Sequence, residues 1–298
     1  MHWIFASLLS ALFLGFYELS TKHAVRGNAV FPVLFLSNVC SATIWLTLLG
    51  LQRANPGLLP GELEVAHLTA FQHAQLFLKS FIVAVSWVCT YFAVKHLPVS
   101  IASPIRATSP VWTLVGALII LAERPTMMET LGIVTTIGCF IGLSIVGRGE
   151  GIHFHRDKWV GWLLMGTLFG TMSSLYDKHL LGRVGYTAST VQCWFSIYLA
   201  VLFLPLAIGW KLRWWPRQEF HWRWSVVLLS LSLLVADYVY FSALRDPEAL
   251  IAVVTSLRRG SALVAFAGGI WLFGEHNSAA KFLAVLGVVA GIVLTILG

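Results

Sequence analysis

Apolar residues along the chain gather into ten long runs, each separated from the next by a more polar stretch. Most runs have about the 20 residues that an α-helix needs to cross the hydrocarbon core of a bilayer. They lack the alternation of outer-membrane barrel strands, and an open sheet edge is not stable in lipid. The pattern therefore predicts an all-α polytopic membrane protein with ten transmembrane helices. The runs cover residues 2–21, 29–51, 77–96, 99–121, 128–147, 159–181, 187–209, 224–244, 248–273 and 279–297.

The composition agrees with this pattern. Of the 298 residues, 58% are hydrophobic and only 11% are charged, against about 25% charged in an ordinary soluble domain. No long polar stretch remains for a separate aqueous domain, so the composition excludes a soluble enzyme, a disordered chain and a secreted disulfide scaffold. The four cysteines lie singly inside apolar runs, without the close spacing of a metal or redox site.

The basic excess has a membrane explanation. A formal net charge of +7 would suggest nucleic acid in a soluble protein. Here most Lys and Arg residues flank apolar runs, where they anchor helix ends near lipid headgroups. The Trp- and Arg-rich stretch at 210–217 has the composition of such an interfacial segment. We expect the partners to be the lipid bilayer and a small molecule, and no nucleic acid.

Four short motifs occur twice in the same order, once in each half of the chain. The repeat predicts two five-helix halves, residues 1–148 and 159–298, in one integral structural unit. Because five is odd, the second half enters the membrane from the opposite side, which makes an inverted repeat suited to alternating access around a midplane site. The matched stretches are 20–23 with 176–179, 91–98 with 240–247, 103–106 with 255–258, and 123–126 with 275–278.

These motifs resemble a known transporter family. The sequence is similar to the ten-helix EamA type of the drug/metabolite transporter superfamily. The similar stretches are the Tyr-Phe-Ala…Pro junction at 91–98, the run that follows it to Glu123, and the matching stretch of the second half from 240–247 to Glu275. The resemblance covers both halves. It implies a carrier in the plasma membrane, of the bacterial inner-membrane kind, with a central cavity lined by the first, third, fourth, sixth, eighth and ninth helices. The superfamily handles amino acids, sugars, nucleotide sugars, organic phosphates and drugs, so the resemblance leaves the substrate open.

Arginines inside the apolar runs are the main candidates for a substrate site, because a charge at the centre of a membrane helix usually faces a cavity or a partner. Arg106 lies in the fourth run with Ser103 on the same helical face, and Arg258 and Arg259 lie in the ninth run near Thr255. The repeat pairs Arg106 with Arg258 near one midplane site. Each arginine could simply be neutralised by an acid, or it could bind a substrate carboxylate or phosphate in bidentate geometry.

The paired arginines carry a second resemblance. Arg258-Arg259 is similar to the paired basic motif in the ninth helix of the sugar-phosphate translocators of the same superfamily. That motif has Lys-Arg rather than Arg-Arg, and the rest of the translocator pattern is missing here. Organic phosphate is therefore one possible substrate among several.

Acidic and basic residues elsewhere in the runs could serve the same site. Asp237, Glu18 and Asp177 could each neutralise an arginine, and Asp237 could instead couple transport to a proton, with a counter-substrate as the other possible coupling partner. Lys22 and Lys178 occupy matched helix ends. There they could snorkel to the membrane interface or act as a gate.

Aromatic residues near these charges could line the cavity. Tyr17, Trp87 and Tyr91 could stack on a ring-bearing substrate, and Tyr240 lies one helical turn from Asp237. Aromatic residues at helical spacing more often serve packing or the membrane interface.

The chain lacks the motifs of other functional classes. It has no Gly-rich phosphate loop of the ATPase kind, so transport should be secondary, and no nucleophile–base pair stands out. We therefore expect no enzyme, cofactor or metal, but a secondary carrier of a small polar metabolite, with an anion favoured. An exporter of amino acids or other zwitterionic or aromatic metabolites is one alternative, and a non-transporting scaffold or lipid-handling protein is another.

The orientation in the membrane stays open. The family resemblance implies that both termini are cytoplasmic. The stretches richest in Lys and Arg, 148–158 and 211–223, fall on the side away from the termini, and the positive-inside rule places such stretches in the cytoplasm.

Overall fold

The computed structural model describes residues 2–96, 105, 106, 108–146, 158–214, 218–261, 264 and 279–297. Ser103 and Glu275 lie outside the described residues, as does the side chain of Lys22. Throughout the described ranges the chain is helical apart from its connections, without any strand. This agrees with the all-α prediction.

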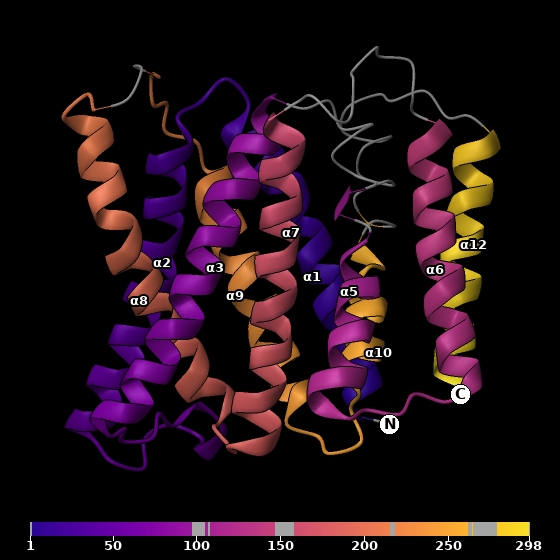
Figure 1. Ribbon diagram of the computed structural model, residues 1–298. Coiled ribbons are helices and arrows are strands. Elements are labelled where there is room, and N and C mark those ends of the chain that lie inside the picture. The colour runs from indigo at the N-terminus through magenta and orange to yellow at the C-terminus, as the bar shows by residue number, and fades with distance from the viewer. Residues whose placement is uncertain are drawn as a thin grey trace.

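The helices follow the order of the predicted runs. Within the described residues, five of them (α1, α2, α8, α9 and the Ala70–Ala93 part of α3) are long and apolar enough to cross a membrane. Figure 1 shows the helices side by side, with both termini at the same end of the bundle. They are α1 (His2–Val25), α2 (Val30–Ala54), α3 (Ala70–His96), α5 (Ser109–Gly116), α6 (Met127–Val146), α7 (Lys158–Lys178), α8 (Ala188–Lys211), α9 (Ser225–Leu244), α10 (Ile251–Arg258) and α12 (Ala279–Leu297). A 3-10 turn, η1 (Gly61–Leu63), precedes α3, and π turns η2 (Ala117–Leu121) and η3 (His179–Arg183) extend α5 and α7.

The third helix begins at Ala70 rather than at residue 77, where the apolar run begins. Thr69 and Gln72 form a reciprocal cap at its start: the Thr69 main-chain N–H donates to Gln72 Oε1 at 2.8 Å, and the Gln72 N–H donates to Thr69 Oγ1 at 3.4 Å. The polar side chains of this first part have partners on the second half of the chain, such as His73 Nδ1, 2.7 Å from Tyr198 Oη. The apolar pattern does not detect the start of this helix at Ala70, because the first part of the helix carries polar side chains.

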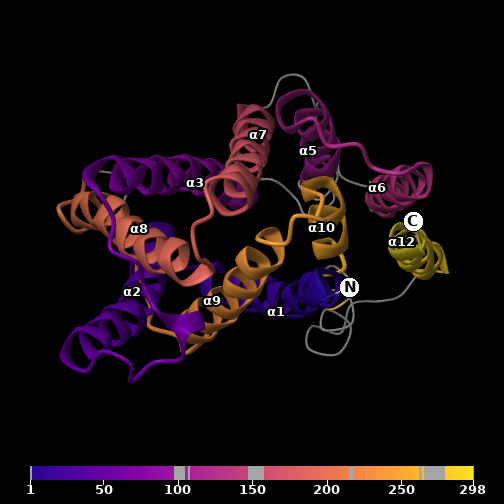
Figure 2. The same cartoon turned by 90° about the horizontal axis from the view of Figure 1, so that it is seen from below.

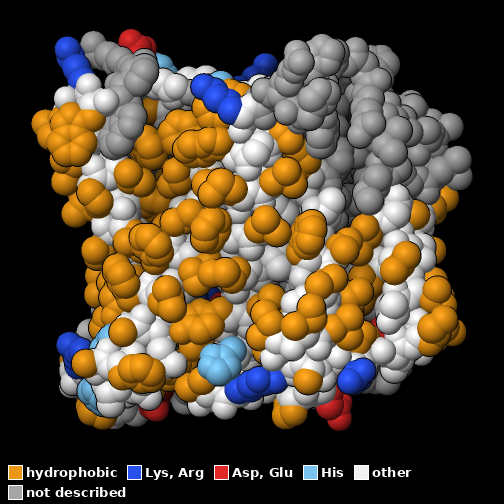
Figure 3. All heavy atoms as spheres, in the orientation of Figure 1, with side chains coloured by type: hydrophobic (Ala, Val, Ile, Leu, Met, Phe, Trp, Pro, Cys, Tyr) orange, Lys and Arg blue, Asp and Glu red, His pale blue; other side chains and the backbone are white. Residues whose placement is uncertain are grey.

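Helices from the two parts of the chain pack against each other in pairs: α1 with α9, α2 with α8, α3 with α7, and α6 with α12. Viewed from the end, α2, α3, α8 and α9 group on one side, α6 and α12 lie together at the opposite edge, and α1, α5, α7 and α10 lie between them (Figure 2). On the face seen in Figure 3, hydrophobic side chains cover the middle and charged ones gather toward the two ends. This surface is that of a bundle immersed in lipid.

Small residues bring α6 and α12 together. A Cβ added at Gly132 would meet Thr295 Oγ1 and main-chain atoms of Thr295 and Gly291, whereas one added at Gly138 of the same helix would meet nothing within 4 Å. Close approach through small residues is a common way for helices to associate in lipid, where the hydrophobic effect gives no drive.

The contrast between these two glycines makes a prediction. Gly132→Ala should lower the free energy of unfolding by about 1–3 kcal/mol, because main-chain atoms must move to admit the methyl group. Gly138→Ala should leave stability unchanged or raise it slightly, because alanine favours helix. Thermal unfolding of both variants in detergent measures this, and equal melting temperatures would contradict the close packing.

Candidate functional site

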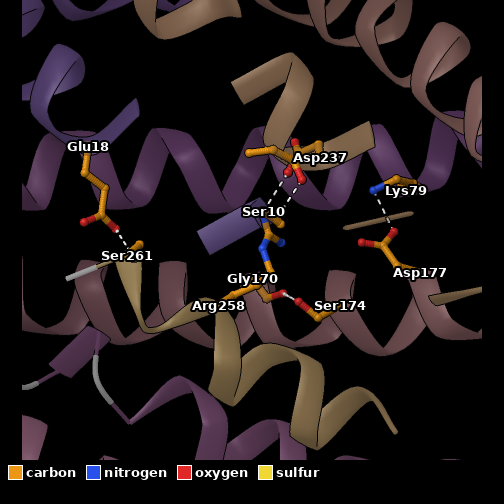
Figure 4. A network of polar contacts seen from close by, with 10 residues as sticks. Ser10, Glu18, Lys79, Gly170, Ser174, Asp177, Asp237, Arg258 and Ser261 are labelled. Carbon is orange, nitrogen blue, oxygen red and sulfur yellow. Dashed lines mark hydrogen bonds and ion pairs between the residues drawn. The ribbon is translucent and has the colours of Figure 1, made fainter. Parts of the chain in front are cut away.

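An arginine and an aspartate pair in the interior of the bundle (Figure 4). Arg258, the last residue of α10, donates from Nη2 to Asp237 Oδ1 of α9 at 3.0 Å, and both side chains are largely buried. The Arg258 guanidinium also lies over the ring of Tyr240, with Cζ 4.0 Å from the ring centroid. Asp237 and Tyr240 thus face Arg258 from neighbouring turns of α9.

A second arginine is more loosely held. Arg106 Nη2 lies 3.9 Å from Glu18 Oε1 of α1, and the Arg106 side chain is 43% exposed. Ser261 Oγ donates to the same Glu18 oxygen at 3.5 Å. Two tyrosines within electrostatic range of Arg106, Tyr17 and Tyr91, share a hydrogen bond between their hydroxyls at 2.9 Å.

Arg259 connects these two groups. It lies within electrostatic range of Arg106, Arg258 and Glu18. Among the described residues, none of the ion pairs within 4.0 Å includes Arg259. The three arginines therefore lie in one region.

A buried lysine adds an ion pair that sequence reasoning missed. Lys79 Nζ of α3 lies 2.6 Å from Asp177 Oδ1 of α7, with side chains 2% and 6% exposed. The ammonium also lies 4.1 Å and 4.8 Å from the ring centroids of Phe195 and Phe241. Asp177, which the sequence offered as a partner for an arginine, pairs instead with Lys79.

Hydropathy places the start of the third apolar run at residue 77, and this start hides the interior position of Lys79. A lysine at residue 79 of a run that starts at 77 reads as a membrane-surface anchor. The helix starts at Ala70, so Lys79 lies nine residues, or about 14 Å, inside it. The capping pattern of Thr69 and Gln72 was the signal that could have found it.

Positive charge exceeds negative charge in this central group. Asp177 lies within electrostatic range of Lys79, Asp237 and Arg258, so the ion pairs and Arg259 form one connected set. Among the residues that the structure describes, the set has four cations and three carboxylates, a formal excess of one positive charge. Its members are Lys79, Arg106, Arg258, Arg259, Glu18, Asp177 and Asp237.

Other candidates serve packing or helix ends. Trp87 stacks on Phe203 with ring centroids 6.2 Å apart, and Thr255 Oγ1 donates to the main-chain oxygen of Ile251 at 2.8 Å within its own helix. Lys178 Nζ donates to the main-chain oxygen of Asp246 at 3.1 Å, beyond the end of α9. None of these contacts involves the central arginines.

Glu123 ties two helix ends together near Lys178. Both of its carboxylate oxygens accept from the Ile251 N–H, at 3.0 Å each, so it caps the positive end of α10. Burial raises the pKa of the Glu123 carboxyl, while the Ile251 N–H and Lys178 act in the opposite direction. Arg183 Nη2 donates to the main-chain oxygen of Leu121 at 2.6 Å, which joins the ends of α5 and α7 beside it.

This cap makes a stability prediction. Glu123→Ala should lower the free energy of unfolding by about 1–2 kcal/mol, because it leaves a helix N-terminus without its acceptor. The matched control, Glu248→Ala, removes an exposed carboxylate and should change little. Denaturant unfolding in detergent compares the two, and an equal effect of both would contradict the capping role.

Comparison with known proteins places this arrangement in a family. The sequence model of the EamA-like transporter family matches residues 1–146. No curated protein matches the chain. Among solved structures, a crystal structure described only as that of a protein matches with a TM-score of 0.76 and 13% identity, covering 99% of this chain and 97% of that chain. At that identity the likeness shows the fold alone.

The matched half, the apolar helices and the likeness of fold agree with one another. The protein is an integral membrane protein, and it belongs to the EamA-like transporter family of the drug/metabolite transporter superfamily.

Proposed function

We propose that the protein is a secondary transporter that carries a small organic anion, a carboxylate or an organic phosphate, across the plasma membrane. The observation that carries this proposal is the unbalanced positive charge of the central group. An uncompensated charge inside a membrane protein is costly and calls for a partner. A substrate anion is such a partner, and it completes the charge balance when it binds.

Arg106 and Arg259 are the residues that we assign to the anion. The Arg106 side chain is 43% exposed, and its ion pair with Glu18 among the described residues is a long one, at 3.9 Å. Its planar donors can therefore bind two oxygens of a carboxylate or phosphate. Tyr17 and Tyr91, whose hydroxyls share a hydrogen bond at 2.9 Å, lie within electrostatic range of Arg106, and we assign them to further hydrogen bonds with the anion or to contact with a ring. In the absence of substrate, Arg258 is held by Asp237.

The pattern of helix contacts supports the inverted repeat and alternating access as parts of the proposal. Exchanging the two halves replaces α1 by α7, α2 by α8, α3 by α9 and α5 by α10. Under this exchange the α1–α9 contact corresponds to a contact between α7 and α3, and the α5–α7 contact corresponds to one between α10 and α1. The structure has all four contacts. Two halves that pack in the same way can swap their conformations to open either side of the site.

Exposure differs between the two parts of the site, and this difference supports a one-sided open state. The Arg106 and Glu18 side chains are 43% and 25% exposed, whereas the Lys79 and Asp177 side chains are 2% and 6% exposed. Glu18 lies toward the end of α1 that is remote from the N-terminus. In the proposed cycle this is the open side, and the side of the termini is closed.

A solute panel in proteoliposomes tests the proposal. Purified protein should exchange labelled gluconate or glycerol 3-phosphate against the unlabelled compound in counterflow, and it should not exchange choline. Protein-free vesicles and vesicles with heat-unfolded protein are the controls. Exchange of choline without exchange of either anion would contradict an anion carrier.

One feature favours a zwitterion as the second candidate. Glu18 lies beside Arg106 with its carboxylate partly exposed, so an amino acid could place its carboxylate on the arginine and its ammonium on Glu18. Counterflow of phenylalanine or leucine in place of gluconate would favour this alternative. The absence of exchange and of binding for every solute would favour a non-transporting scaffold or lipid-handling protein.

A further inference from the structure

The two halves of the site differ at an acidic position that lies next to an arginine. Tyr91 and Tyr240 correspond in the repeat, and the residue three positions earlier is Val88 in the first half and Asp237 in the second. The arginine of the second half therefore has a carboxylate of its own from α9, at 3.0 Å. In the first half the nearest carboxylate to Arg106 comes from α1, at 3.9 Å.

Asp237 satisfies Arg258 only in part. The pair has a single hydrogen bond, from Nη2 to Oδ1. Arg258 Nε is buried and has no hydrogen-bond partner among the described residues. A guanidinium in such a place can donate two parallel hydrogen bonds, so a bidentate carboxylate or phosphate would bind it better than Asp237 does.

We propose that the Asp237 carboxylate occupies the place of the substrate anion on Arg258 while the site is empty. The arriving substrate displaces Asp237 from Arg258, and Asp237 then takes up a proton. This inference rests on the proposed anion transport. In the step, the Asp237–Arg258 ion pair breaks, substrate oxygens form hydrogen bonds to Arg258, and a proton from water binds the freed Asp237 carboxylate. Arg258 keeps its own proton throughout, because arginine does not lose it in proteins. For a monoanion, the bound anion first cancels the excess positive charge of the central group, and the proton on Asp237 then restores it, so the loaded site has the same charge as the empty site.

The groups around Asp237 fit this role. The charged or titratable groups that face it are Arg258 on α10, Lys79 on α3, Asp177 on α7 and Tyr240 on α9. From α1, Ser10 reaches α9 beside it but donates to the Ala236 main-chain oxygen at 2.7 Å. Lys79 is held by Asp177 at 2.6 Å, so it is not available to neutralise a displaced Asp237. A proton is the charge that remains to do so.

A pH gradient in proteoliposomes tests this role with gluconate as the probe. A gradient of about one pH unit, acid outside, should drive about tenfold accumulation of gluconate by the wild-type protein at a stoichiometry of one proton per anion. Clamping the membrane potential with potassium and valinomycin should not change the accumulation. Asp237→Asn should retain gluconate counterflow and lose the gradient-driven accumulation. Asp246→Asn, which alters a partly exposed acid beyond the end of α9, should keep both.

The outcomes separate this inference from the proposed function. If Asp237→Asn still accumulates gluconate with the pH gradient, the role of Asp237 is refuted while anion transport stands. If the wild-type protein moves no anion, the proposed function fails and this inference fails with it. If Asp237→Asn does not fold, the wild-type protein in weakly buffered detergent decides instead: uptake of one proton per gluconate bound supports the role, and binding without proton uptake overturns it.

Discussion

Replacing Arg106 with alanine is expected to lower the counterflow of gluconate or glycerol 3-phosphate by about a hundredfold, which corresponds to the loss of a well-placed charged hydrogen-bonding partner. Arg106 is the most exposed of the ion-paired members of the central group, and its contact with Glu18 is long. Its removal should therefore cost substrate binding while it costs little stability. Initial rates of counterflow over a range of anion concentrations measure the loss.

Two further variants separate charge from geometry. Arg106→Lys keeps the positive charge but loses the planar fork, and we expect a rate between those of the wild type and the alanine variant. Arg124→Ala removes an exposed arginine from the connection after η2 and should transport normally. Normal anion exchange by Arg106→Ala would show that the exposed arginine does not bind substrate.

Replacing Lys79 with alanine is expected to have the largest effect on stability, a loss of about 3–5 kcal/mol in the free energy of unfolding. The variant leaves Asp177 buried without its cation and also removes the ammonium from between the rings of Phe195 and Phe241. Unfolding in mixed detergent with increasing denaturant measures the loss. Lys211→Ala, at the exposed end of α8, is the matched control.

The double variant Lys79→Met, Asp177→Leu distinguishes a structural pair from a functional one. Removing both charges should restore most of the stability, because an apolar pair of similar volume can replace a buried ion pair. If the double variant is as unstable as Lys79→Ala, the loss comes from packing rather than from the unpaired carboxylate. If it is stable but does not transport, the charges serve the transport cycle.

Much of the helix order could be predicted from the sequence, because each crossing requires a long apolar run and little else competes with that signal. The boundaries were less accessible. The polar start of α3 is held by the Thr69–Gln72 cap and by contacts to α8, which hydropathy does not detect. The π turns at the ends of α5 and α7 likewise left no mark in the apolar pattern.

The charged site could be predicted in part. Arg106, Arg258 and Asp237 stood out because they interrupt apolar runs, and the pairing of Arg258 with Asp237 follows from adjacent helices of one half. The Lys79–Asp177 pair joins α3 to α7, and no local pattern specifies a contact between helices so distant in the chain. Trp87 stacks on Phe203, and its place in a cavity stays a prediction, because an aromatic ring on an interior helix face serves packing equally well.

The central claim is that the unbalanced charge of the arginine group binds one anion, and calorimetric titration of the purified protein tests it most directly. We expect gluconate or glycerol 3-phosphate to bind the wild-type protein at one molecule per chain, and Arg106→Ala to show no binding in the same range. Affinity should fall as the salt concentration rises, because chloride competes for the same charge. Unchanged binding in Arg106→Ala, or binding of choline in place of the anions, would contradict the account.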